Sequence, residues 1–315
     1  MPAHAQDAQE VRSPHPHLRA LRPPLQLAEE MVAGLGQCAL LFGCMPGREG
    51  VRRGRENVAT QLKTPTDVRA QVSAEEWERR VDLACAYRLV AHYGWDDLIF
   101  THLSVRVPGP EHHFLINPYN LMFDEITASS LVKIDVQGNP VMETPYMTNP
   151  AGFTIHSAVH MAREDAHAVM HLHTPMGQAV SAQSEGLMPL TQTAMLIRDE
   201  VAYHHYEGVA VDLDERERLV ADLGTKNAMI LRNHGTLAVG ETVGEAFIRL
   251  YFLERACEAQ IHALAGGTQL VNHPPQGTPE KTKEQGATGL KMVGNLLAWP
   301  ALRRKMDRLD PSYAT

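Results

Sequence analysis

The sequence predicts a layered α/β fold, in which strands and helices interleave within one domain. "FTHLSVRV" (100–107) alternates apolar and polar residues as a half-buried strand does. "TIHSAVHMA" (154–162) instead repeats its apolar residues at helical spacing. "AMILRNHGTLAVG" (228–240) predicts two more short strands around a polar break. Because the two kinds of element alternate along the chain, their apolar faces are expected to pack as layers around a common core.

Composition excludes several classes of protein. The chain has 315 residues, 44% of them hydrophobic and 21% charged, which is typical of a globular protein. Its formal net charge of −8 argues against nucleic acid or an anionic membrane as the main partner, because both favour a basic face. The four cysteines show no C-x-x-C spacing, and no apolar run is long enough to span a bilayer. We therefore expect a cytoplasmic protein with reduced thiols.

Three regions differ in composition. Residues 1–72 are rich in Pro, Arg, Gly and Gln, and we expect this N-terminal extension to be partly disordered. Residues 73–266 carry the regular patterns and form the predicted domain. Residues 267–315 form a C-terminal tail, Pro/Gly-rich at first and then helical over about 289–309.

The domain is predicted to open with a helix that begins after Ser73, because "SAEE" is a capping box. In the strand that follows, Leu103, Val105 and Val107 share one face. His102, Ser104 and Arg106 share the other, which we expect to be exposed. "HFLINP" and "SSLVKIDVQGN" predict two more strands.

A second helix is predicted to follow Asn149, with Pro150 at its first position. His156 and His160 lie four residues apart on one face of this helix. A third helix is predicted after Thr242, which forms a capping box with Glu245.

Three histidines suggest a metal site. "AVMHLHT" predicts a short strand that directs His171 and His173 to the same face. With 17 histidines in the chain, roughly one H-x-H pair is expected by chance, and His15 and His17 form another. Spacing alone is therefore not sufficient, and a lone histidine is more often structural. His234 in "RNHG" supplies a third ligand where Gly235 permits a close approach, and three protein ligands with open positions are typical of catalytic metal sites.

Several motifs together resemble the class II aldolase/adducin family, most closely its adducin-head-like branch. They are "THLSVRVP", "LINPYNLMFDEITASSLVKIDVQGN", "NPAGFTIHSAVHMARED", "MHLHT", "EVAYHHYEG" and "LRNHGTLAVGETVGEAF", in unbroken order over about 73–266. The resemblance implies a three-layer α/β/α sandwich with a mixed or antiparallel sheet. It also implies a homotetramer with sites between subunits, and a divalent metal on His171, His173 and His234. Zinc is the first expectation, with iron or manganese as alternatives.

The sequence departs from the sugar-phosphate aldolases of this family. Gly152 stands where they carry the glutamate that acts as acid and base, and Pro150 and Ala151 replace two serines that help to hold the phosphate. Their Gly-Asn-x-Ser phosphate loop is replaced by residues 101–104, "THLS". No tyrosine stands near positions 192–193, where the aldolases carry a second acid. These changes argue against a sugar phosphate as substrate.

What remains predicts a divalent-metal-dependent lyase, a decarboxylase or aldolase-like enzyme, acting on a small hydroxy- or keto-acid. Decarboxylation is preferred because no base has to start it. His102, Ser104 and Arg106 are candidates to bind the carboxylate-bearing substrate, and His156 to return a proton. The structural alternatives are a solvated Arg106 and a His156 bonded to a neighbouring loop.

Two other functions stay open. Three imidazoles also suit iron(II), as in an oxygenase resembling those of aminocoumarin biosynthesis. Adducins keep a similar head and serve as actin–spectrin adaptors, which suggests a non-catalytic assembly or actin-binding head. The mixed-charge end "ALRRKMDRLDPSYAT" lacks the lysine-rich character of adducin tails, which argues against actin binding.

Overall fold

The computed structural model describes residues 67–148, 150–208, 214–286 and 289–315. Most of the predicted N-terminal extension, 1–66, and the predicted cap Asn149 lie outside the described residues. Residues 67–72 are described, and they contain a helical turn, α2 (Val68–Gln71). Val68 and Val72 pack against the main core, so this short stretch belongs with the domain that follows it.

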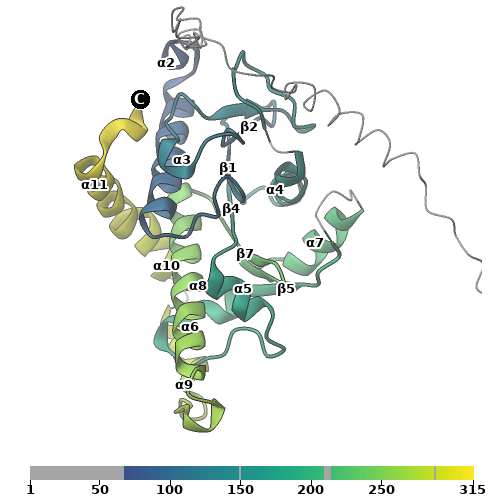
Figure 1. Cartoon of the computed structure of the whole chain (residues 1–315), viewed down its shortest axis with the longest axis vertical. Coiled ribbons are helices and arrows are strands. Elements are labelled where there is room, and N and C mark those ends of the chain that lie inside the picture. Colours follow the sequence, from purple (N-terminus) through teal and green to yellow (C-terminus); the bar gives the residue numbers. More distant parts are fainter. Residues whose placement is uncertain (1–66, 149, 209–213, 287–288) are drawn as a thin grey trace, which may run out of the picture. The chain divides into compact units, whose positions relative to one another are not determined.

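A seven-stranded mixed sheet forms the centre of the fold, in the order β3-β2-β1-β4-β7-β6-β5 (Figure 1). The strands are β1 (His102–Arg106), β2 (Phe114–Ile116), β3 (Val132–Ile134), β4 (Ala168–Leu172), β5 (Val201–His204), β6 (Ala228–Leu231) and β7 (Gly235–Gly240). Within it, β5 and β6 are parallel and the other neighbours are antiparallel. The predicted strands over 100–107, 168–174 and 228–240 are confirmed.

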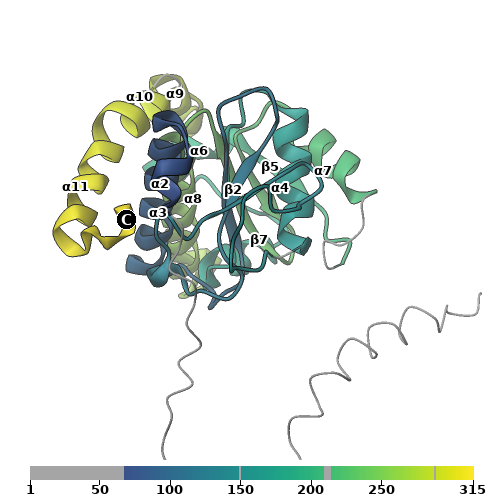
Figure 2. The same cartoon turned by 90° about the horizontal axis from the view of Figure 1, so that it is seen from above.

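Helices cover both faces of this sheet, which confirms the three-layer α/β/α sandwich (Figure 2). On one side lie α3 (Ala74–His92), α5 (Pro175–Ser181), α6 (Gln192–Ile197) and α8 (Val243–Leu264). On the other lie α4 (Pro150–Ala162) and α7 (Glu215–Leu223). The alternation in β1 determines its orientation, because Leu103 and Val105 are buried against α3 while His102 and Ser104 face α4. Among the described residues, no helix combines the length and apolar character that a bilayer span requires.

The predicted helix caps explain where α3 and α8 begin. The Ser73 side chain accepts a hydrogen bond from the backbone N–H of Glu76, and that of Thr242 accepts one from Glu245. The Glu76 carboxylate bonds to Arg80 and Lys133. Glu76 therefore anchors α3 to the β3 side of the sheet in addition to its place at the start of the helix.

The C-terminal segment packs against the domain. It contains α9 (Thr278–Gly286), α10 (Gly289–Met292), a π-helical stretch (Val293–Ala298) and α11 (Trp299–Leu309), with the helix predicted near 289–309 confirmed. Trp299, Met306 and Tyr313 are buried in the core against α3 and α8. Arg88 of α3 forms an ion pair with Asp310, at 2.9 Å between nitrogen and oxygen. The segment is therefore a layer of the fold, although composition alone predicts a loose tail.

Candidate metal centre

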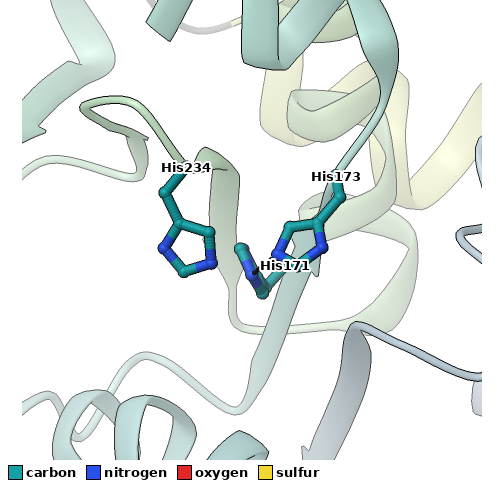
Figure 3. A group of neighbouring side chains, drawn as sticks. All are labelled: His171, His173 and His234. Atoms are coloured by element: carbon teal, nitrogen blue, oxygen red, sulfur yellow. Dashed lines mark hydrogen bonds between the residues drawn. The ribbon is translucent and has the colours of Figure 1, made fainter. Parts of the chain in front are cut away.

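Three imidazoles converge at one end of the central strands (Figure 3). His171 lies in β4, His173 follows the end of that strand, and His234 lies in the turn between β6 and β7. One ligand nitrogen from each ring lies within 4.8 Å of the other two, and the ring centres are 4.7–4.9 Å apart. His171 is buried and the other two are half-buried. The structure thus brings together the three residues predicted as metal ligands.

Local backbone geometry brings His234 to the end of β4. β7 pairs with β4 so that Thr236 lies opposite Leu172, and the turn before it contains Asn233 at a φ of +55°. A Cβ on Gly235 would lie 2.3 Å from the Leu172 carbonyl oxygen. Glycine is therefore required for a close approach of two backbones, and Asn233 supplies the left-handed residue of the turn.

Hydrogen bonds determine which nitrogens face the centre. His171 Nδ1 lies 2.9 Å from the Thr236 carbonyl oxygen and His173 Nδ1 lies 3.2 Å from Asp97 Oδ2. Both partners can only accept, so each Nδ1 carries the proton and each Nε2 presents a lone pair. Histidines that bind metals commonly donate their other N–H to such partners.

The two bare Nε2 atoms of His171 and His173 lie 3.0 Å apart. Two lone pairs at that distance repel each other unless a cation lies between them. Zinc holds imidazole nitrogens at about 2.0–2.1 Å, which places two ligands of a tetrahedral site about 3.3–3.4 Å apart. The donor set therefore fits a divalent metal.

Burial also keeps His171 and His234 neutral. Burial, followed by repulsion from His173, lowers the pKa of His234 to about 4. The pKa of His171 lies well below its usual value because of burial and then repulsion from His234 and His173. Neutral imidazole is the form that coordinates a metal, so His171 and His234 are ready to bind one at pH 7.

The predicted substrate-binding face lies next to this centre but is buried. His102 is paired across the sheet with His171, and Ser104 follows it on the same face of β1. The exposed fractions of His102 and Ser104 are 5% and 2%. The expectation of an exposed face is wrong, because α4 packs over it. The guanidinium of Arg106 donates to the backbone carbonyl of His160 and is therefore not a freely solvated side chain.

His156 and His160 of α4 share the Ser104 hydroxyl. Ser104 Oγ lies 2.6 Å from His156 Nδ1 and 2.7 Å from His160 Nε2, and His160 Nδ1 lies 2.7 Å from the Ala166 carbonyl oxygen. Since that carbonyl accepts, neutral His160 accepts the Ser104 proton, and His156 Nδ1 donates to Ser104. This leaves His156 Nε2 unprotonated, and it is buried without a hydrogen-bond partner among the described residues.

This arrangement refines the predicted role of His156. Burial and then repulsion from His102 hold its pKa well below the usual value, so it carries no spare proton at rest. A proton donor in the reaction would first have to accept a proton at Nε2. The i,i+4 spacing of His156 and His160 identified the shared helix face, but sequence reasoning missed the Ser104 link between them.

Sequence reasoning also missed three residues that support the centre. Asp97 lies in an irregular segment after α3, where no periodic pattern marks it. Thr236 contributes through its backbone, which sequence patterns do not reveal. Glu254 interrupts the apolar stripe of α8 and is buried there. A charged residue on an apolar helix face was the sequence signal that could have identified it.

Comparison with known proteins identifies the family. The family model for the class II aldolase and adducin N-terminal domain matches residues 81–261. The chain therefore belongs to the class II aldolase and adducin family, whose enzymes are generally metal-dependent lyases.

Individual relatives include both branches of this family. A Caulobacter vibrioides protein provisionally named a class 2 aldolase is 58% identical over 78% of this chain and 96% of its own length. Mouse alpha-adducin is 40% identical over 80% of this chain, but the match spans 37% of the adducin. Solved structures are similar as well. An aldolase II superfamily protein of Pseudomonas syringae has 50% identity, a TM-score of 0.75 and coverage of 79% of this chain and 100% of its own. The L-fuculose 1-phosphate aldolase of Glaciozyma antarctica has 29% identity, a TM-score of 0.67 and coverage of 80% and 96%.

Proposed function

We propose that this protein is a metal-dependent lyase that acts on a small acid with a neighbouring hydroxyl or keto group, and that decarboxylation is favoured over aldol cleavage. The observation that carries the proposal is the cluster of three imidazoles, together with Gly152 in place of a carboxylate on the helix that faces it. Membership of a family of metal-dependent lyases supports the reaction class.

The ligand set favours stabilisation of an anion. When bound, a divalent metal held only by neutral ligands keeps its double positive charge and acts as a Lewis acid toward adjacent oxygens. The described residues place histidines alone in the cluster, so no carboxylate ligand of theirs reduces that charge. The Nδ1 atoms of His171 and His173 are hydrogen-bonded to Thr236 and Asp97, so the orientation of these two rings does not depend on the substrate.

Decarboxylation matches the missing base. When a carboxylate leaves as carbon dioxide, the bonding electron pair stays on the substrate, and no proton has to be removed first. A later step must return a proton to that carbon. His156 is our candidate for this step, taking a proton at its bare Nε2 and passing it on. His102, Ser104 and Arg106 are then proposed to shape the pocket wall beside it.

We further propose zinc as the metal, with iron or manganese as the alternatives, a cytoplasmic location, and a homotetramer. The tetramer is supported by family membership, and light scattering at micromolar concentration tests it. A monomer would contradict any site that is built between subunits.

Metal content tests the centre directly. Protein purified without added metal is expected to contain one divalent ion per chain by elemental analysis. His234→Ala should lose it, because two ligands remain, whereas His262→Ala, an exposed position on α8, should retain it. Equal metal content in the two variants would contradict the proposed site.

Turnover distinguishes the substrate classes. Small 2-hydroxy and 2-keto acids should be consumed with release of carbon dioxide, and His156→Ala should slow turnover while the metal stays bound. Cleavage of L-fuculose 1-phosphate at about 1 s⁻¹ or faster, an ordinary enzymatic rate, would contradict the proposal.

A non-catalytic role is the second candidate, and the 40% identity to alpha-adducin is the observation that raises it. Co-sedimentation with actin filaments, without turnover of any acid in the panel, would establish that role instead. An iron oxygenase would be recognised by oxygen uptake that requires iron and one of the acids.

A further inference from the structure

Glu254 is a buried carboxylate that contacts two threonines next to the ligand-bearing histidines in the chain. It lies on α8, and its exposed fraction is 2%. The hydroxyl of Thr174 donates to its Oε2 and the hydroxyl of Thr236 donates to its Oε1. Both carboxylate oxygens are thus held by uncharged donors.

This carboxylate has no cationic partner among the described residues, since no lysine, arginine or histidine of theirs forms an ion pair with it. Burial raises the pKa of Glu254 to about 7 despite the two hydroxyl donors. A buried and unpaired charge is unfavourable, and an uncharged side chain of similar volume would be tolerated better. Stability of the chain alone therefore does not account for a glutamate here.

The two threonines connect Glu254 to every segment that carries a metal ligand. Thr174 directly follows His173, and its hydroxyl also caps α5 by accepting from the Gly177 backbone N–H. The Thr236 carbonyl accepts from His171 Nδ1, and Thr236 lies two residues after His234. One carboxylate therefore bridges the end of β4 and the start of β7.

The packing around this bridge is close. A Cβ added to Gly177 would lie 2.8 Å from Thr174 Oγ1, 3.0 Å from Thr236 Cγ2 and 3.3 Å from Glu254 Oε1. The absence of a side chain at position 177 lets α5, β7 and α8 meet at this point. The bridge is thus built into the junction of three elements.

We propose that Glu254 is a positioning residue for the metal centre, which sets the separation of the two ligand-bearing segments and supplies a buried counter-charge to the bound cation. The inference rests on the proposed metal site. It explains the unpaired carboxylate, because three neutral imidazoles leave the charge of a divalent ion uncompensated, and a negative charge one layer below them complements it.

Two effects of opposite sign follow for Glu254→Gln. The metal-free variant should unfold at the same temperature as the wild type or higher, because a buried charge is removed. Its affinity for Zn²⁺ should fall about 10- to 100-fold, the usual effect of losing an outer partner of metal ligands. A side chain that only holds the fold together would not raise stability and weaken metal binding at once.

Glu245 provides a matched control on the same helix. It is buried to a similar degree, with 3% exposed, but it forms an ion pair with Arg249 at 2.6 Å. Glu245→Gln should lower the unfolding temperature of the metal-free protein, because it leaves Arg249 without that partner. Its Zn²⁺ affinity should stay within about twofold of the wild type.

The experiment uses the full chain, stripped of metal and titrated with Zn²⁺ or Co²⁺ against a chromophoric chelator. The absorption spectrum of Co²⁺ reports the ligand geometry independently of activity. Thr236→Val should reproduce the loss of affinity, and Thr236→Ser should restore it. This pair keeps the test decisive if Glu254→Gln does not fold.

The outcomes are distinguishable. Wild-type protein that binds neither ion would overturn the metal centre and this inference together. Wild-type protein that binds them, with Glu254→Gln or Thr236→Val within about twofold of it, would overturn the role of Glu254 alone.

Discussion

At the level of single residues, the site depends on which imidazole nitrogens carry protons. His171 donates to a backbone carbonyl and His173 to Asp97, which leaves a lone pair on each Nε2. The same reasoning, applied to His160 and Ser104, leaves a lone pair on His156 Nε2. Burial then keeps the rings of His171, His156 and His160 neutral. The interior of this protein therefore holds several imidazoles that are more basic when the chain is unfolded.

Acid should destabilise the metal-free protein for this reason. Burial lowers the pKa of His160 to about 3 and that of His102 to about 4, against 6.5 in the unfolded chain. Below pH 6.5 the unfolded state binds more protons, so stability is fully present above that pH and is lost as pH falls toward the folded values. As pH falls from 6.5 to 5, each of these two histidines should lower the free energy of unfolding by roughly 2 kcal/mol.

Urea unfolding at a series of pH values measures this effect. His160→Asn should be less stable than the wild type at pH 7 but show a shallower loss of stability toward pH 5. Exposed His262 serves as the control, and His262→Ala should keep the wild-type slope. A slope that His160→Asn leaves unchanged would mean that this ring does not titrate as its burial requires.

At the level of elements, the junction of β4 with the β6–β7 turn determines the site. Gly235 lets β7 begin against Leu172, so an alanine there must push the two backbones apart. We expect Gly235→Ala to lower the free energy of unfolding by about 1–3 kcal/mol, as overpacking does, and to reduce metal content. Gly289→Ala is the control, because no atom of the described residues beyond its chain neighbours lies within 4 Å of its added Cβ. Urea unfolding and elemental analysis compare the two, and equal behaviour would contradict the close approach.

Elements with a local pattern were predictable from sequence, and those fixed by distant partners were not. The alternation in β1 and the caps at Ser73 and Thr242 depend on near neighbours, so strands and helices could be located. The burial of His102 and Ser104 depends on α4, and His156 of that helix lies 52 residues after Ser104, so the exposure of that face was predicted wrongly. The packing of the C-terminal segment left a weak signal in the sequence, because its buried residues Trp299, Met306 and Tyr313 are spaced seven residues apart.

The candidate site was predictable to a similar extent. The three ligands follow from spacing and from resemblance to a family. Asp97 contacts the centre through its carboxylate and Thr236 through its backbone carbonyl, and no sequence pattern records either contact. Glu254 was missed because the apolar stripe around it indicates a buried helix face but does not reveal its two partners, the hydroxyls of Thr174 and Thr236.

At the level of the whole molecule, the domain should fold without residues 1–66. A chain of residues 67–315 retains Val68 and Val72 on the core and Arg69 over the ring of Trp77, at 5.4 Å. We expect it to match the full chain in metal content and to unfold within about 2 °C of it. A chain that begins at Ser73 loses those contacts and should unfold at a lower temperature. Insoluble or metal-free 67–315 protein would contradict this expectation.

The strand order also has a kinetic consequence. β4 lies between β1 and β7, both far from it in sequence, and His171 meets Thr236 across 65 residues of chain. Such long-range pairings form slowly, because large loops must close first. The third ligand therefore arrives only after the centre of the sheet has assembled. A metal that binds this late stabilises the native state but not the transition state. It should slow unfolding and leave the folding rate unchanged, so that metal supply determines how long each folded molecule lasts.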